Sequence, residues 1–518
     1  MAAASIRSGV IAILALLEVG LSLPARADGF RGGIGDALGK RFEAAPELGG
    51  ARTIRPPRHG YDAKEQLLRW NQIAIDASGL DHTPVAPGES RVFGEQLGPG
   101  RASRAMAIVH IAMFDAVNAS AGGYRSYTGL PAAPPGTSMD AAIAQAAHDT
   151  LAALFPSQRA RFGAWLAEDL GPVPVWQRRG QENGIRLGRR AAAAILALRS
   201  HDGSQHGEPK VGVDYPTSDE PGMWRQDPIS QIPLALGAYW GGVKPFVLRS
   251  VEPFRAPEPP ALGSEEYASA FDEVQRLGGD GVVTPTERSD DQTFAGIFWA
   301  YDGTPSLCAP PRLYNQITVQ IALQRGGGAP ELARLLALVN TAMADAGIAI
   351  WESKYFYGYW RPITGIREAD EGTGPTGKGD ENPETTGDPE FSPLGAPASN
   401  LVGPNFTPPF PAYPSGHAGF GGAVFQTLRR FYGTDQIAFT FVSDEFNGET
   451  LDNQGSPRPL MPRSFANLSE AEEENGQSRI YLGIHWSFDK TAGIAQGRAV
   501  ADAVFRKAFL PVGRGGPR

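Results

Sequence analysis

The chain has 518 residues and a formal net charge of -9 at pH 7, and no basic stretch is sustained along it. This charge balance argues against nucleic acid and anionic membrane as partners. A single cysteine, Cys308, excludes an intrachain disulfide framework, so the stability of the fold must come from packing. A small-molecule enzyme is the class that these properties favour.

The N-terminus has the charge and hydropathy pattern of a secretory signal. Arg7 precedes the apolar run 9–23, and Ala25-Arg26-Ala27 gives a small-residue cleavage site. We therefore predict a signal peptide over residues 1–27 and export to the periplasm or the cell exterior, with a retained N-terminal anchor as the alternative. Residues 28–63 form an N-terminal extension. No later run reaches roughly 18 uninterrupted apolar residues, so we expect no membrane contact in the mature form.

The first half of the mature chain, residues 64–262, reads mainly as helix. Apolar residues recur three and four positions apart, a period typical of amphipathic helices, in 64–119, 141–155 and 182–199. His110 and His148 lie in these predicted helices and are interpreted as structural or surface residues. Residues 202–262 are instead rich in Gly, Pro, Trp and Asp without a period, which predicts long connecting loops. Loops of this length are often functional.

Helical periodicity resumes in the second half, residues 263–518. It covers 265–277, 290–302, 315–324, 331–360, 419–432 and 478–509. Within 331–360 one apolar stripe at helical spacing is assigned to the core, namely Leu332, Leu336, Val339, Met343, Ala346 and Ile350. Strand signals are sparse. The predicted fold class is all-α, with two packed four-helix-bundle-like halves and long connecting loops.

An acidic segment interrupts the second half at residues 368–390. It is rich in Gly, Pro and Thr and carries eight carboxylates: Glu368, Asp370, Glu371, Asp380, Glu381, Glu384, Asp388 and Glu390. A solvated surface loop is the interpretation that this composition favours. A calcium site is the alternative, although the ligand spacing matches no calcium loop.

The first motif that bears on chemistry pairs a lysine with an arginine. Lys354 and Arg361 stand seven residues apart, about two helical turns, which predicts two cations on one helical face. Pro362 is expected to end that helix directly after the arginine. Taken alone, this spacing is weak evidence, because a lysine and an arginine so placed on a helix usually form a solvated face.

The second motif is Pro414-Ser415-Gly416-His417 before the apolar run 418–432. It places a hydroxyl, a glycine N–H and an imidazole at a predicted helix N-terminus, where free N–H groups and the helix dipole favour an oxyanion. The alternative for Ser415 is a purely structural N-cap.

The third motif runs from Ser478-Arg479 to His485 and Asp489. Asp489, four residues after His485, can hold the Nδ1–H of that imidazole and make Nε2 the better nucleophile or metal ligand. Arg479 and His485 do not fall on one helical stripe, so we expect a turn near Gly483. A surface hydrogen bond between His485 and Asp489 is the alternative.

Together the motifs read K-x6-R-P, P-S-G-H and S-R-x5-H-x3-D. This pattern resembles the signature shared by the vanadium-dependent haloperoxidases and the type 2 phosphatidic acid phosphatases. The long interval between His417 and Ser478 favours the haloperoxidase branch, and residues 442–463 are interpreted as the extra loop. Further segments are similar to fungal chloroperoxidases of this family, and weaker likeness reaches back to about Trp70. The clearest segments are 296–317, 343–362, 405–426 and 478–489.

The resemblance implies vanadate as the cofactor and no haem. It implies His485 Nε2 as the single protein ligand of vanadium, and His417 as a general acid–base that does not ligate. The groups expected to hold the oxygens are Lys354, Arg361, Arg479, Ser415 and the Gly416 N–H. Lys354 is also expected to polarise the peroxide, and Asp302 to pair with Arg479.

The implied reaction uses hydrogen peroxide to oxidise halide to hypohalous acid, which halogenates a small organic acceptor. Trp351 and Phe410 match aromatic positions beside the chloroperoxidase pocket, so we predict chloride oxidation together with bromide and iodide. Both aromatic residues could instead serve packing alone. One rival function is an exported acid phosphatase that acts through a phosphohistidine at His485. The other is a non-catalytic helical scaffold, and the oligomeric state is left open.

Overall fold

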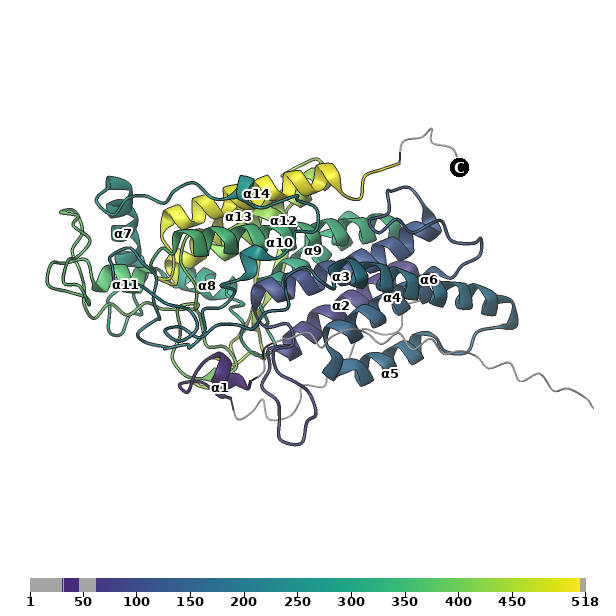
Figure 1. Ribbon diagram of the computed structural model, residues 1–518, viewed down its shortest axis with the longest axis horizontal. Helices are drawn as coiled ribbons and strands as arrows, with labels where there is room; N and C mark the ends of the chain where they lie inside the picture. The colour runs from purple at the N-terminus through teal and green to yellow at the C-terminus, as the bar shows by residue number, and fades with distance from the viewer. Residues whose placement is uncertain (1–29, 31, 46–61, 513–518) are drawn as a thin grey trace, which may run out of the picture.

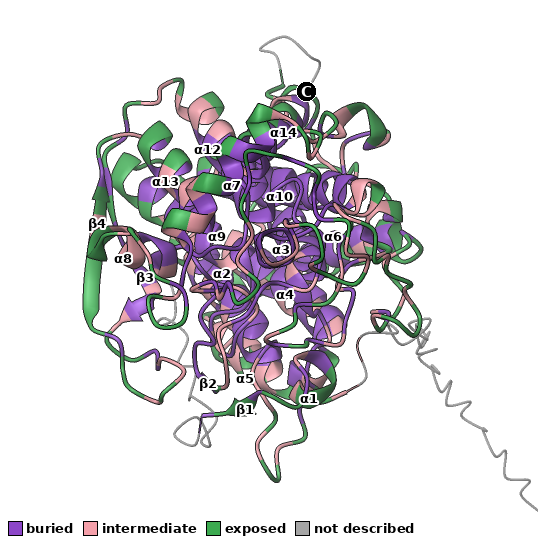
Figure 2. Ribbon diagram, turned by 90° about the vertical axis from the view of Figure 1, so that its left-hand side faces the viewer, coloured by how far each residue is buried: buried purple, intermediate pink, exposed green. Residues whose placement is uncertain are grey.

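The computed structural model describes residues 30, 32–45 and 62–512. The predicted signal peptide, residues 1–27, lies outside these described residues, as does much of the predicted extension 28–63. The described part of the chain is mostly helical, which confirms the predicted all-α class. Its few short strands lie at the edges of the helical body (Figures 1 and 2).

Two helices of the first half begin where a polar side chain satisfies free backbone N–H groups. Asp62 accepts from the backbone N–H groups of Lys64 and Glu65, and Ser138 caps the helix that follows it in the same way. The elements are α2 (Ala63–Asp81), α3 (Gly98–Ala121), α4 (Met139–Leu154), η2 (Pro156–Gln158), α5 (Arg159–Asp169) and α6 (Val175–Arg199). The region 64–119, expected as continuous helical text, is therefore two helices joined by a loop.

The second half contributes eight helices to the described structure. They are α7 (Glu265–Leu277), α8 (Asp290–Phe298), α9 (Pro310–Arg325), α10 (Ala329–Tyr357), α11 (Pro362–Arg367), α12 (Gly416–Tyr432), α13 (Leu468–Tyr481) and α14 (Ser487–Lys507). Between the halves, the predicted loops hold only short 3-10 turns, η3 (Trp240–Gly242) and η4 (Glu252–Phe254). The turn expected near Gly483 is present, because Gly483 adopts φ +71° between α13 and α14.

α10 is the central helix of the molecule. It packs against α3 of the first half and against α12 and α14 of the second. Figure 2 shows the buried residues concentrated in these inner helices. The predicted stripe from Leu332 to Ile350 is buried, and one continuous hydrophobic core runs through both halves. Among the described residues α10 alone is long and apolar enough to cross a membrane, and its apolar window lies wholly inside the protein.

In the part of the chain that the structure describes, four strands form two antiparallel pairs. β1 (Glu43–Ala44) pairs with β2 (Leu401–Val402), which ties a short N-terminal segment containing α1 (Ile34–Ala37) to the body. β3 (Phe439–Asn447) pairs with β4 (Leu460–Phe465). The interpretation of 442–463 as a loop is therefore wrong at its two ends, which form strands, and buried positions alternate with more exposed ones along most of β3.

The acidic segment 368–390 is more ordered than a solvated loop. Asp380 is buried and accepts from the Asn382 backbone N–H and the Thr385 hydroxyl, and Asp370 accepts from the Gly387 N–H. These carboxylates thus hold the turns of their own segment. Within the described ranges no cluster of three or more His, Cys, Asp or Glu residues could hold a metal ion, so the calcium alternative gains no support.

Candidate functional site

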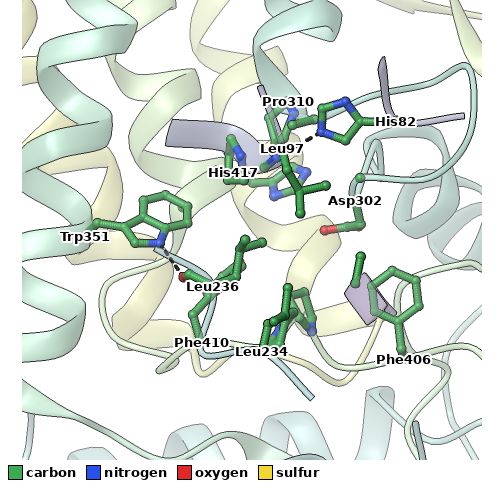
Figure 3. Close-up of a pocket in the computed structure, with 18 of the residues that line it drawn as sticks. His82, Leu97, Leu234, Leu236, Asp302, Pro310, Trp351, Phe406, Phe410 and His417 are labelled. Atoms are coloured by element: carbon green, nitrogen blue, oxygen red, sulfur yellow. Dashed lines mark hydrogen bonds between the residues drawn. The ribbon is translucent and has the colours of Figure 1, made fainter. Parts of the chain in front are cut away.

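A largely apolar pocket with an empty volume of about 720 Å³, its mouth included, opens between the two halves. Among the sequence-predicted residues it is lined by Asp302, Trp351, Phe410, Gly416, His417, Arg479 and His485. Figure 3 shows His417, Asp302, Trp351 and Phe410 around this space. Lys354, Arg361 and Ser415 do not line it, and their side chains are buried behind its wall.

Lys354 lies in the last turn of α10 and is completely buried. Its Nζ donates to the carbonyl oxygens of Pro411 and Ala412, both at 2.8 Å, and lies 5.1 Å from the centre of the Phe410 ring. Burial and the nearby Arg361 hold the pKa of this amine well below its usual value. An ammonium group held here by neutral carbonyl dipoles would be stabilised by a neighbouring anion.

Arg361 reaches the same site by a different route from the one predicted. α10 ends at Tyr357, because Gly358 adopts the left-handed conformation that commonly stops a helix. Arg361 is the N-cap of α11, and Pro362 begins that helix instead of ending the previous one. The two cations therefore do not share a helical face. A turn brings the two side chains together. The guanidinium carbon of Arg361 lies 5.0 Å from the centre of the Phe410 ring, which Lys354 Nζ also faces.

Arg361 is fully buried and is held by carbonyl oxygens. Its Nε donates to the Phe410 carbonyl at 2.9 Å, and Nη1 donates to the Ile484 carbonyl at 2.8 Å. Nη1 also lies 2.9 Å from His485 Nε2. One guanidinium thus links the loop before Ser415 to the imidazole that precedes α14.

Arg479 and Asp302 form the predicted pair. Arg479 Nη2 donates to both carboxylate oxygens of Asp302 at 2.8 Å, and both side chains are nearly inaccessible to solvent. The other two guanidinium nitrogens, Nε and Nη1, are buried and have no hydrogen-bond partner among the described residues. Since Arg479 lines the pocket, these donors are available to a ligand there.

The motif Ser415-Gly416-His417 starts α12 as predicted. The Ser415 hydroxyl accepts from the Ala418 N–H at 3.4 Å, so its structural N-cap role is real. A Cβ added to Gly416 would meet Trp351 at 3.4 Å and Lys354 at 3.9 Å, so it would occupy the space beside these two side chains. His417 Nε2 donates to the Ala300 carbonyl, which leaves Nδ1 as the basic nitrogen. Burial and the nearby Arg479 lower the pKa of His417 well below its usual value.

His485 and Asp489 are hydrogen-bonded, although His485 precedes α14 and only Asp489 lies on that helix. His485 Nδ1 donates to the Asp489 carboxylate at 2.7 Å, and the Trp486 N–H donates to the same oxygen at 3.0 Å. This contact fixes the tautomer, so that Nε2 carries the free electron pair. Burial and the guanidinium of Arg361 lower the pKa of His485 well below its usual value, while burial raises the pKa of Asp489 to about 7.

Trp351 and Phe410 pack against each other with ring centroids 5.0 Å apart. The Trp351 indole N–H donates to the Leu236 carbonyl at 3.0 Å, as Figure 3 shows. The loop that carries Leu236 therefore fixes the indole. Both aromatic side chains are at once core residues and part of the pocket wall.

Sequence reasoning missed a second set of lining residues, which come from distant parts of the chain. They are Ala37, Leu38, His82, Leu97, Leu234, Leu236, Phe406 and Phe420. His82 is buried, and its ring nitrogens contact the Ser78 carbonyl at 2.9 Å and the Gly98 N–H at 3.0 Å. No local motif distinguishes these residues, because a buried apolar residue and a pocket-lining apolar residue have the same sequence pattern.

The donor set fits a small oxyanion such as vanadate. Three basic side chains, Lys354, Arg361 and Arg479, are buried together with the carboxylates of Asp302 and Asp489. The unpaired nitrogens of Arg479, the free N–H groups at the start of α12 and the electron pair of His485 Nε2 supply further contacts. Vanadate would be held by these groups, with His485 Nε2, which lies 2.9 Å from Arg361 Nη1, as the imidazole nitrogen that would ligate.

Comparison with known proteins agrees with this geometry. Residues 334–512 match the family model described as the VCPO second helical-bundle domain. The vanadium chloroperoxidase of Curvularia inaequalis is 31% identical over 510 residues, covering 82% of this chain and 79% of that protein.

Solved structures support the fold. A bacterial vanadium-dependent iodoperoxidase superposes with a TM-score of 0.66 at 23% identity, over 89% of this chain and 100% of the other. An apo-type bacterial vanadium-dependent chloroperoxidase gives 0.57 at 18% identity, over 79% and 94%. With the curated relative matched over most of both lengths, the chain belongs to the vanadium-dependent haloperoxidase family.

Proposed function

We propose that the chain is a vanadate-dependent haloperoxidase that uses hydrogen peroxide to oxidise halide to hypohalous acid, for the halogenation of small organic acceptors. Family membership supports a peroxidase-type enzyme with vanadate as its cofactor. The observation that carries the proposal is the buried pocket in which Arg479 has two unused donors and His485 presents Nε2. Vanadate, when bound, supplies a Lewis-acidic centre that activates peroxide without changing oxidation state.

The residues of the chain do the binding and the proton transfer. Arg361 and Arg479 hold and neutralise the oxyanion, while Lys354 offers its ammonium group to the peroxide oxygen that receives negative charge. His417 Nδ1 accepts a proton from hydrogen peroxide and returns one to the departing oxygen. Asp489 keeps the His485 imidazole in the tautomer that ligates.

The decisive experiment compares two activities in one preparation. Purified protein is assayed for bromide oxidation with peroxide and for hydrolysis of p-nitrophenyl phosphate, each with and without added orthovanadate. We expect halide oxidation that depends on orthovanadate. The rival acid phosphatase would hydrolyse the phosphate ester efficiently without vanadate and show no vanadate-dependent halide oxidation.

Chloride is the proposed halide, with bromide and iodide also accepted. The contact of Trp351 with Phe410, and the seating of Lys354 over the Phe410 ring, support an apolar and partly desolvated halide position. Chlorination of monochlorodimedone at acid pH tests this assignment. Bromide oxidation without any chlorination would refute it.

The proposal includes export of the protein from the cytoplasm. The pattern of residues 1–27 predicts a cleaved signal peptide. N-terminal sequencing of protein recovered from the periplasm or the medium should begin near Asp28. Full-length protein retained inside the cell would contradict export.

A further inference from the structure

One short segment after α8, residues 298–302, carries two contacts of the site. The Ala300 carbonyl accepts the Nε2–H of His417, and the Asp302 carboxylate accepts from Arg479 at 2.8 Å. The position of this segment therefore sets both the basic nitrogen of His417 and the direction of the Arg479 donors.

The segment has a backbone conformation that needs external support. Tyr301 adopts φ +48°, a left-handed conformation that costs free energy for a bulky residue. Strand β3 supplies the support. The Ser443 hydroxyl donates to the Phe298 carbonyl at 2.7 Å, and the Asp444 N–H donates to the Tyr301 hydroxyl at 2.6 Å. The Tyr301 N–H in turn donates to Glu445 Oε1 at 3.3 Å.

Glu445 is itself rigidly held. It is fully buried, and its Oε2 accepts from Arg458 Nη1 at 2.7 Å and from the Ser399 hydroxyl at 2.6 Å. Arg458 also donates to the Ser399 hydroxyl at 2.9 Å. An isolated buried carboxylate is costly, whereas one with an arginine, a hydroxyl and a backbone N–H is a fixed point in the structure.

Apolar contacts also attach the hairpin. Phe441 packs edge-on against Phe298 at 5.9 Å between ring centroids, and Phe446 packs against Phe294 at 4.6 Å. Attachment through these aromatic rings does not explain why Ser443 and Glu445 are buried with their oxygens directed at residues 298–301.

We propose that Glu445 is a positioning residue for the oxyanion site. It acts through residues 300–302 on His417 and Arg479, so the β3–β4 hairpin contributes to the geometry of that site. The roles of His417 and Arg479 in turnover rest on the proposed function. The effect of Glu445 on vanadate binding can be measured without turnover.

The test measures orthovanadate affinity by calorimetry on vanadate-free protein, and kcat with bromide, for four variants. Glu445→Ala removes the acceptor of the Tyr301 N–H, while Glu445→Gln keeps an acceptor oxygen there. Ser443→Ala removes the contact with Phe298. Thr440→Ala is the matched control, because it removes a hydroxyl that pairs with the Ser464 hydroxyl at 2.8 Å on the exposed side of the same hairpin.

We expect Glu445→Ala to weaken orthovanadate binding by about 10-fold or more, the range seen when groups behind a metal ligand shell are lost, and to lower kcat as well. Glu445→Gln should recover most of the affinity, Ser443→Ala should lose about threefold by the same reasoning, and Thr440→Ala should bind like wild type.

Equal affinity in folded Glu445→Ala and wild type, or an equal loss in Thr440→Ala, overturns the proposal. If Glu445→Ala does not fold, unchanged affinity in Ser443→Ala overturns it. A wild-type protein that binds orthovanadate but oxidises no halide refutes the proposed function, and the affinities still decide the role of Glu445.

Discussion

Arg479 donates to both oxygens of Asp302 through one nitrogen, Nη2, and its Nε and Nη1 remain unpaired within the described structure. The guanidinium is thereby fixed at one end and open at the other. An arginine that used its whole fork on the carboxylate would have nothing left for a ligand. Asp302 therefore orients a donor toward the pocket and also offsets its charge.

The first prediction concerns this pair. Asp302→Asn leaves the buried Arg479 without a carboxylate, so we expect the free energy of unfolding of vanadate-free protein to fall by about 3 kcal/mol. Chemical denaturation measures it. Saturating orthovanadate should restore part of the loss, because a ligand that binds only the folded state stabilises it. An unchanged denaturation midpoint would show that Arg479 has another counter-charge.

The second prediction separates a ligand from its support. His485→Ala should abolish both orthovanadate binding and turnover, since it removes Nε2. Asp489→Asn should weaken binding by about 10- to 100-fold while leaving some turnover at high orthovanadate, because the amide no longer fixes the tautomer. Calorimetry and bromide assays measure both effects. A His485→Ala variant that binds vanadate and turns over would refute the assignment.

The third prediction concerns Trp351. Gly237 has φ +78°, and a Cβ there would lie 2.3 Å from the indole nitrogen. Gly237→Ala should displace the indole and raise the KM for halide more than it lowers kcat. Gly242→Ala, in the same loop, is the control because its Cβ meets no atom within 4 Å. Equal halide KM values in the two variants would mean that the position of Trp351 does not affect halide binding.

The fourth prediction is a pH dependence of stability. Burial raises the pKa of Glu445 to about 7 from its ordinary 4.5, so the folded state binds its proton more tightly than the unfolded state does. The stability from this group is complete below about pH 4.5 and is lost as the pH rises through about 7, by at most about 3 kcal/mol. The stability of wild type relative to Glu445→Gln should therefore fall over that window in urea denaturation. A constant difference would contradict the shift.

The site was more predictable than the route by which the chain builds it. The residue types and spacing identified Lys354 and Arg361 correctly as neighbours, but for the wrong reason. The sequence contains the signals that correct it, since Gly358 can stop a helix and Pro362 is favoured in a first turn. The uninterrupted apolar pattern over residues 331–360 instead predicted a helix that continues to Arg361. The alternation in β3 was likewise available, whereas the contacts of Leu236 with Trp351 and of Glu445 with Tyr301 join residues 115 and 144 positions apart and follow no local rule.

The short pairing of β1 with β2 has a consequence for how the molecule is made. It places Ala37 and Leu38 in the pocket wall by joining residues 43–44 to residues 401–402. The strand that pairs with this segment lies more than 350 residues later in the chain. Contacts so distant in sequence form slowly. The pocket therefore acquires its final wall only after most of the chain exists, and removal of the residues up to 45 would leave one side of the pocket open.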